Sequence, residues 1–324
     1  MSDGMHVAIG LPRDATDDHL AFAKQLGCSG VVLASPAALP GDQQWEYEDL
    51  LRLRLWVESF DLRLEAIQNW PPSFINKVRL GLAGRDEQLA HCQATIRNLG
   101  RAGISVFSYN WRPNQLYRTG TRPSRGGAEV TTFDLALARD LPLSHERVYS
   151  AEEIWANYEY FIRAVVPVAE ESGVRLALHP DDPPGPAIGG VARIFSSFEG
   201  FERASRLVDS PSWGLLFCVG CWSEMGGNDN VLRGIRHFGP RGQIVYVHFR
   251  DVQGTGDQFA ECFIGEGNVE VTTVMRALRD VGFDGFLIDD HVPHLRGDTG
   301  WAPRGRANST GYLMGLLRAV NDLT

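Results

Sequence analysis

The feature that most constrains the fold is an alternation of short β-type runs with longer helical patterns along most of the chain. Eight hydrophobic runs are predicted as strands at 6–11, 30–35, 63–69, 105–111, 175–181, 213–220, 244–252 and 285–291. Helices are predicted near 16–26, 45–60, 86–101, 151–172, 197–208, 229–238, 269–281 and 306–322. Repeated strand–helix units indicate a parallel α/β sheet, and eight of them predict a closed (β/α)8 TIM barrel. An open doubly wound sheet is less favoured, because no glycine-rich phosphate loop follows the first strand.

Residues 112–150, after the fourth predicted strand, form a long irregular segment that interrupts this alternation. A loop of this length in a compact domain is usually functional or disordered. Its basic residues include Arg112, Arg118, Arg122 and Arg125. We expect a lid at the carboxyl-terminal face of the barrel that contacts an anionic substrate, with a solvated surface loop as the alternative. Because no linker or repeat divides the chain, we predict a single TIM-barrel domain over 1–324, with 112–150 as an insertion.

The composition excludes several classes of partner. The 324 residues carry a formal net charge of −9, which argues against nucleic acid and against anionic membranes. No apolar run approaches the ~20 residues of a transmembrane helix, and the first residues lack the pattern of a signal peptide. The five cysteines are scattered and odd in number, so we expect free thiols and a cytoplasmic protein. The oligomeric state stays open, a homo-oligomer included.

Metal-binding side chains stand at the ends of the last four predicted strands. These residues are His179, Cys218, His248 and Asp290. Side chains at positions i and i+2 of a strand share a face, so Ala177 and His179 oppose Leu176 and Leu178. The same alternation places all four candidates on the face toward the barrel axis, and active sites of TIM barrels lie at the carboxyl ends of the strands. We therefore predict that these residues form one metal site.

The proposed ligands suit a divalent transition metal. Two imidazoles, a thiolate and a carboxylate favour Zn, Fe or Mn over Mg. A lone strand histidine or cysteine is more often a packing residue, so the prediction depends on the four occurring together. His291 follows Asp290 directly, where it could act as a general acid or base, and we predict this pair as catalytic.

Further polar or aromatic residues near the rim are candidate substrate contacts. Asn110 and Trp111 end the fourth predicted strand, Asp181 follows the first proposed ligand, and Arg250 lies near the end of the seventh strand. Arg118 lies in the insertion, and Arg306 precedes the last helix, where it could neutralise a substrate carboxylate. These six residues are our predicted substrate-binding set.

Several motifs resemble the D-mannonate dehydratase family. They are HPDDPP at 179–184, Cys218, HFRDV at 248–252, and the Asp290–His291 pair. Supporting stretches include HCQATIRNLGRAGI, SYNWRP, YRT, FAECFIGEGNVEVTTVMRAL and GRANSTGYLMGLL, so the similarity runs from about Arg63 to the end of the chain.

The resemblance implies a metal-dependent, xylose-isomerase-like TIM barrel that uses Mn²⁺ or Fe²⁺. It implies the same four ligands, with His291 as a catalytic acid or base. The activity implied is that of a hydro-lyase of hexuronate catabolism, which converts a small-molecule sugar acid, D-mannonate, to 2-keto-3-deoxy-D-gluconate and water.

The chain also departs from the family pattern and is somewhat shorter than typical members. Ile288–Asp289 stands where the family usually has Arg-Pro, and Trp301 stands where it tends to have a tyrosine, proposed as a second catalytic group. These departures keep two alternatives open, a sugar isomerase or epimerase on the same metal barrel and a non-catalytic sugar-acid-binding relative. The retained ligand set and His291 favour the two enzymes over the third reading.

Overall fold

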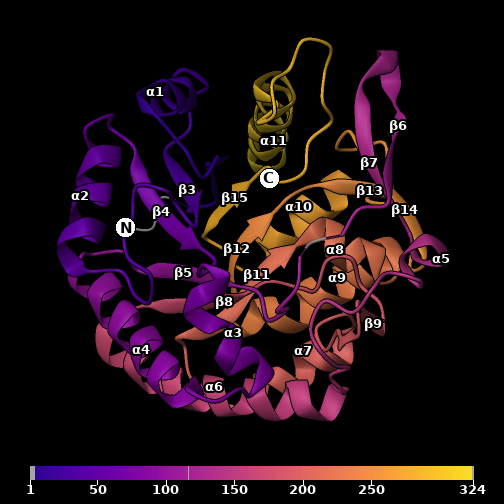
Figure 1. The fold of residues 1–324 in the computed structure, drawn as a ribbon. Helices are drawn as coiled ribbons and strands as arrows, with labels where there is room; N and C mark the ends of the chain where they lie inside the picture. The colour runs from indigo at the N-terminus through magenta and orange to yellow at the C-terminus, as the bar shows by residue number, and fades with distance from the viewer. Residues whose placement is uncertain (1–3, 116, 323–324) are drawn as a thin grey trace.

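The computed structural model describes residues 4–115 and 117–322, and their central element is the predicted parallel barrel (Figure 1). Its strands are β1 (His6–Val7), β2 (Ile9–Leu11), β3 (Gly30–Ala34), β4 (Arg63–Gln68), β5 (Val106–Tyr109), β8 (Arg175–Leu178), β11 (Trp213–Cys218), β12 (Ile244–His248) and β15 (Phe286–Ile288). The first predicted strand is split at Ala8 into β1 and β2. Because β1 pairs with β15 and β2 pairs with β3, both in parallel, this one strand closes the barrel.

Several strands end earlier than the sequence predicts, and this difference shapes the rim. The fourth predicted strand is β5, which stops at Tyr109. The fifth is β8, which stops at Leu178, and the eighth is β15, which stops at Ile288. The chain leaves the ladder at these points, so the polar residues that follow lie on short rim segments. The predicted run 244–252 is in fact β12 followed by a separate strand, β13 (Asp251–Thr255).

Helices surround the barrel (Figure 1). The expected ones are α1 (Asp17–Gln25), α2 (Tyr47–Glu58), α4 (Arg85–Arg101), α6 (Ala151–Ser172), α7 (Phe198–Ser205), α9 (Gly227–Phe238), α10 (Val271–Asp280) and α11 (Pro303–Asp322). Three further helices of the described chain were not expected, namely α3 (Pro72–Leu80), α5 (Leu135–Ala138) and α8 (Val219–Glu224). Helix α8 starts directly where β11 ends, so no turn residues separate the two. No described helix has the length and apolar character needed to span a membrane.

Two apolar layers confirm the predicted alternation of side chains along the strands. The outer layer, between strands and helices, contains Leu176, Leu178 and Phe217. The interior layer contains their opposite-face neighbours, such as Ala177 and Cys218. Val245 also lies in the interior layer, although simple alternation assigns it to the outer one. The pairing of β11 with β12 skips this residue, and such a bulge resets the alternation.

The insertion after β5 contains helix and strand that the sequence did not predict, whereas 112–115, 117–119 and 139–148 are irregular as expected. It contains β6 (Gly120–Pro123), a 3-10 turn (Arg125–Gly127), β7 (Glu129–Asp134) and α5 (Leu135–Ala138). Strands β6 and β7 join β13 and β14 (Gln258–Cys262) in an antiparallel sheet of order β13-β14-β7-β6, which stands beside the barrel (Figure 1). Through the pairing of β7 with β14, the sheet connects the segment after β5 with the segment after β12. Smaller elements are β9 (Ala187–Ile188), β10 (Val191–Ala192) and a second 3-10 turn (Gly239–Arg241).

The close approach of α4 and α6 gives a test of the outer layer. A Cβ added at Gly100 would overlap the backbone carbonyl oxygen of Ser172. We expect Gly100→Ala to lower the free energy of unfolding by about 1–3 kcal/mol, the usual cost of overpacking. Gly311→Ala is the matched control, because an added Cβ there meets nothing within 4 Å and alanine favours an exposed helix. Urea denaturation measures both, and equal stability of the two variants would contradict the expectation.

Candidate metal centre

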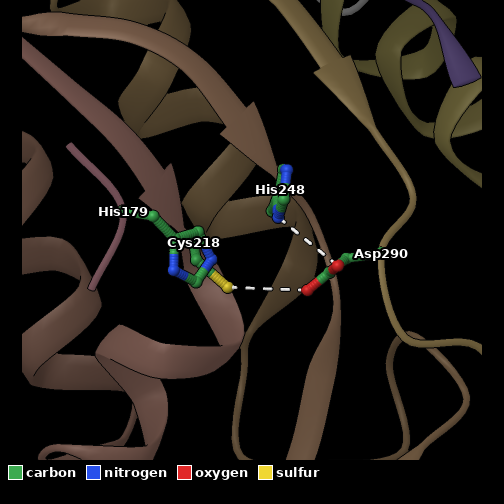
Figure 2. A group of neighbouring side chains, drawn as sticks. All are labelled: His179, Cys218, His248 and Asp290. Atoms are coloured by element: carbon green, nitrogen blue, oxygen red, sulfur yellow. Dashed lines mark hydrogen bonds and ion pairs between the residues drawn. The ribbon is translucent and has the colours of Figure 1, made fainter. Parts of the chain in front are cut away.

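The four predicted metal ligands converge at the carboxyl end of the barrel (Figure 2). One ligand atom each from His179, Cys218, His248 and Asp290 lies within 4.8 Å of the other three. His248 Nδ1 is 3.5 Å from one carboxylate oxygen of Asp290, and Cys218 Sγ is 3.9 Å from the other. The residues come from four neighbouring strands or strand ends, as the alternation of strand side chains predicts.

The polar contacts of the two histidines suit a cation. His179 Nδ1 donates a hydrogen bond of 2.7 Å to the carbonyl oxygen of Pro180, which leaves Nε2 with a free lone pair. The side chain of His248 is 2% exposed, and neither ring nitrogen has a hydrogen-bond partner. Buried polar atoms are normally bonded, so the donor set of two nitrogens, one sulfur and one carboxylate fits a divalent transition metal.

The charges around the cluster keep its anionic groups deprotonated. Burial raises the pKa of Cys218, but the hydrogen bond from Cys221 and the positive charge of Arg250 outweigh it and hold the pKa well below its usual range. The thiolate is the form that binds metals. Burial lowers the pKa of His248, but the charge of Asp290 outweighs it and raises the pKa to about 9. A cation at the cluster therefore takes the place of a proton on His248.

Arg250 connects four carboxyl groups behind the ligand cluster. Its side chain is 1% exposed. Nε is 3.0 Å from Asp290 Oδ2, and Nη2 is 2.9 Å from Asp182 Oδ2. Nη1 is 2.8 Å from Glu224 Oε1 and 3.0 Å from Glu261 Oε2. These contacts occupy the guanidinium, so Arg250 holds the candidate ligand Asp290 in place; a contact of Arg250 with substrate stays a prediction.

His291 lies beside the cluster and is held from behind. Glu261 Oε1 is 2.9 Å from His291 Nδ1, and Arg118 Nη2 is 3.0 Å from the same nitrogen. Burial lowers the pKa of His291, but the charges of Asp290 and Glu261 outweigh it and raise the pKa. A protonated Nδ1 donates to Glu261, which directs Nε2 to the side of Asp290, whose Oδ1 is 3.9 Å away.

Of the residues that contact His291 Nδ1, Glu261 is the one that the sequence analysis did not identify. It lies on β14, in a hairpin that the strand pattern did not predict. Arg118 pairs with it at 2.7 Å and with Asp182 at 2.6 Å. The only sequence signal was the stretch FAECFIGEG, within a segment of family resemblance.

Two of the predicted substrate contacts, Trp111 and Asp181, are buried and form hydrogen bonds within the protein. Trp111 is 1% exposed, and its indole nitrogen donates to the carbonyl oxygen of Ile154 in α6. That nitrogen is the only polar atom of the side chain, so none remains for a substrate. Asp181 is 2% exposed and accepts a hydrogen bond of 2.9 Å from the backbone of Phe195, which fixes the loop after β8.

A cavity of about 200 Å³ adjoins the cluster on the side of His291. Asp290, Trp301 and Arg306 also line it. Arg306 Nη1 is 3.0 Å from Asp289 Oδ2, and the Trp301 indole donates to the carbonyl oxygen of Gly10 at 3.3 Å. Asp289 thus anchors Arg306 at the cavity wall. Asn110, the last predicted contact, lines a second cavity on the opposite half of the rim.

Several known proteins similar to this chain are described as mannonate dehydratases. A family model described as D-mannonate dehydratase (UxuA) matches residues 13–145 and 139–324. The mannonate dehydratase of Thermotoga maritima is 31% identical over 92% of both chains. The crystal structure of mannonate dehydratase from Streptococcus suis serotype 2 superposes with a TM-score of 0.85 at 30% identity, covering 99% of this chain and 95% of that one.

A more distant structure shares the fold. A xylose isomerase domain protein from Planctomyces limnophilus has a TM-score of 0.63 at 14% identity, with 98% of this chain and 99% of that chain covered. At this identity the match shows the barrel architecture alone.

The ligand cluster is tested by metal binding. We expect the metal-stripped protein to bind one Mn²⁺ per chain, and His248→Gln to weaken that binding by about 100-fold, because one of four ligands is lost. Isothermal titration calorimetry measures the affinity, and circular dichroism confirms folding. His91→Gln on α4 is the matched control and should bind like the unchanged protein. Wild-type affinity in His248→Gln would show that the cluster does not hold the ion.

Proposed function

Because the chain belongs to the D-mannonate dehydratase family, we propose that it removes water from D-mannonate and releases 2-keto-3-deoxy-D-gluconate. The observation that carries the proposal is the position of His291, held by Glu261 beside the four-residue ligand cluster. An acid or base next to a metal site is what an elimination beside a carboxylate requires.

The ligand cluster accounts for the metal dependence that the family implies. We propose that His179, Cys218, His248 and Asp290 hold Mn²⁺ or Fe²⁺. Once bound, such an ion supplies a Lewis acid that stabilises negative charge on the oxygens of the substrate. Arg250 keeps the carboxylate of Asp290 oriented through its 3.0 Å contact.

His291 is the proposed proton carrier. In the reaction, the proton on C2 leaves, the electron pair of that bond forms the C2–C3 double bond, and the C3 hydroxyl departs with an added proton. The resulting enol rearranges to the 2-keto acid. His291 Nδ1 is hydrogen-bonded to Glu261. Nε2 of His291 is therefore the atom that moves one of these protons. The side chain is 31% exposed and lines the 200 Å³ cavity, where a substrate can reach it.

We also propose that residues 1–324 form a single TIM-barrel domain whose insertion, 112–150, acts as a lid. Arg118 and Thr131 of the insertion line the same cavity as His291, so the insertion forms part of its wall. A cytoplasmic location is proposed from the free, buried cysteines of the described chain, since a thiolate ligand is best preserved in a reducing compartment.

The proposed function is tested directly by a product assay. We expect the Mn²⁺-loaded protein to form a 2-keto-3-deoxy acid from D-mannonate, and His291→Asn to lower kcat by about 10²–10⁴-fold while Mn²⁺ stays bound, the usual loss for a general acid or base. His237→Gln on α9 serves as the control. Interconversion of free sugars without dehydration of D-mannonate would refute the proposal and favour an isomerase.

Glu261 gives a second test of the same mechanism. Glu261→Gln removes the charge that holds the protonated Nδ1 of His291, so we expect kcat to fall by about 10–100-fold with Mn²⁺ affinity unchanged. Glu266→Gln, an exchange beyond the end of β14, is the matched control. Parallel measurements of thermal unfolding separate this effect from loss of stability. Unchanged kcat in a folded Glu261→Gln variant would remove Glu261 from the mechanism.

A further inference from the structure

The larger of the two rim cavities described lies on the half opposite the ligand cluster. It has a volume of about 600 Å³ and opens at the carboxyl ends of β3, β4 and β5, where Ser35, Asn69 and Asn110 line it. Residues of the insertion also line it, and they include Arg112 and His145. Neither the metal cluster nor His291 uses this space, so its chemistry needs a separate account.

The cavity wall carries two arginines that lack acidic partners. The described residues that line the cavity include Arg79 and Arg112. None of these lining residues is an aspartate or a glutamate. Other buried arginines of the described chain, such as Arg118 and Arg250, pair with carboxylates at 2.6–3.0 Å. Arg79 and Arg112 form no such ion pair in the part of the chain that the structure describes. A buried charge without a direct ion-pair partner is unfavourable.

The two arginines also repel one another. Burial lowers the pKa of Arg79 to about 9, and the nearby charge of Arg112 contributes to this lowering. Burial likewise lowers the pKa of Arg112, against the opposing charges of Asp182 and Asp181. Both guanidinium groups stay protonated near neutral pH, so an anion in the cavity would relieve the repulsion.

Residues of the cavity wall also carry unpartnered hydrogen-bond donors. The indole nitrogen of Trp70 and the Nε atoms of Arg79 and Arg112 are buried without a hydrogen-bond partner. Trp70 is 2% exposed and Arg79 is 3% exposed. Buried donors normally find acceptors, so the described protein leaves part of the polar character of this wall unsatisfied.

A chain of amides adds a further donor. Arg79 Nη2 donates to Asn110 O at 2.7 Å and to Asn110 Oδ1 at 3.1 Å. This orients the amide so that Asn110 Nδ2 donates to Asn69 Oδ1 at 2.8 Å, and the amide nitrogen of Asn69 remains. Asn69 and Ser35 have φ angles of 64° and 42°. Non-glycine residues with such angles cluster at ligand sites.

We propose that this cavity is a carboxylate-binding subsite for a sugar acid, in which Arg112 contacts the carboxylate. The inference rests on the proposed function and deepens it, because it assigns to one cavity the group that distinguishes a sugar acid from a neutral polyol. An aldonic acid such as D-mannonate presents one carboxylate at C1, and the aldaric acid D-mannarate presents a second at C6. Both have the chemistry that the arginine-lined wall recognises.

The test is calorimetric titration of the 324-residue, Mn²⁺-loaded chain with the His291→Asn exchange, which slows turnover. The three ligands are D-mannonate, D-mannarate and the uncharged analogue D-mannitol. We expect Arg112→Gln to weaken binding of at least one acid by 10-fold or more and to leave D-mannitol unchanged. Arg112→Lys, which keeps the charge, should lose less affinity. Arg97→Gln, an exposed position of α4, is the matched control.

The source of the carboxylate follows from which acid responds. Weaker binding of D-mannonate places the C1 carboxylate in the cavity, whereas weaker binding of D-mannarate alone places the C6 carboxylate there. Unchanged affinity for both acids in Arg112→Gln overturns the subsite, as does an equal loss for D-mannitol. These results can be separated from the test of the proposed function. A chain with His291 intact that dehydrates no D-mannonate refutes the proposed function. The subsite is decided separately, by whether the binding of the acids depends on Arg112.

Discussion

The candidate site depends on one buried cation. Arg250 contacts Asp182 from the loop after β8, Glu224 from α8, Glu261 from β14 and Asp290 after β15. Without it these carboxyl groups would repel one another in a medium that screens charge poorly. Burial and the charge of Asp182 hold the pKa of Glu224 well above its usual range. Breaking such a buried pair usually costs about 3–5 kcal/mol, and here the loss would also release a proposed metal ligand.

The barrel and the ligand cluster could be predicted because both depend on local periodicity. Alternation along a strand decides which face a side chain takes, and active sites of barrels lie at the carboxyl ends of their strands. His179 and Cys218 therefore converge although β8 and β11 are joined by a long connection. The alternation failed at Val245, where a bulge places two successive residues on the inner face.

Features that depend on distant pairing could not be predicted in this way. Strand β7 has an alternating pattern, EVTTFD, but nothing in it names β14 as its partner. Glu261 was missed for that reason, since the hairpin that carries it was not expected. Arg250 and Trp111 were identified as rim residues, yet only the fold decides that one meets four carboxyl groups and the other the backbone of α6.

The start of the insertion has a consequence for how specificity can change in this fold. Tyr117 lines the larger cavity, and the next residue, Arg118, lines the smaller one. A single peptide unit is thus a common partition between two chambers, and Arg118 fastens it to Asp182 and Glu261. A shift of the backbone at this point therefore reaches the walls of both cavities at once.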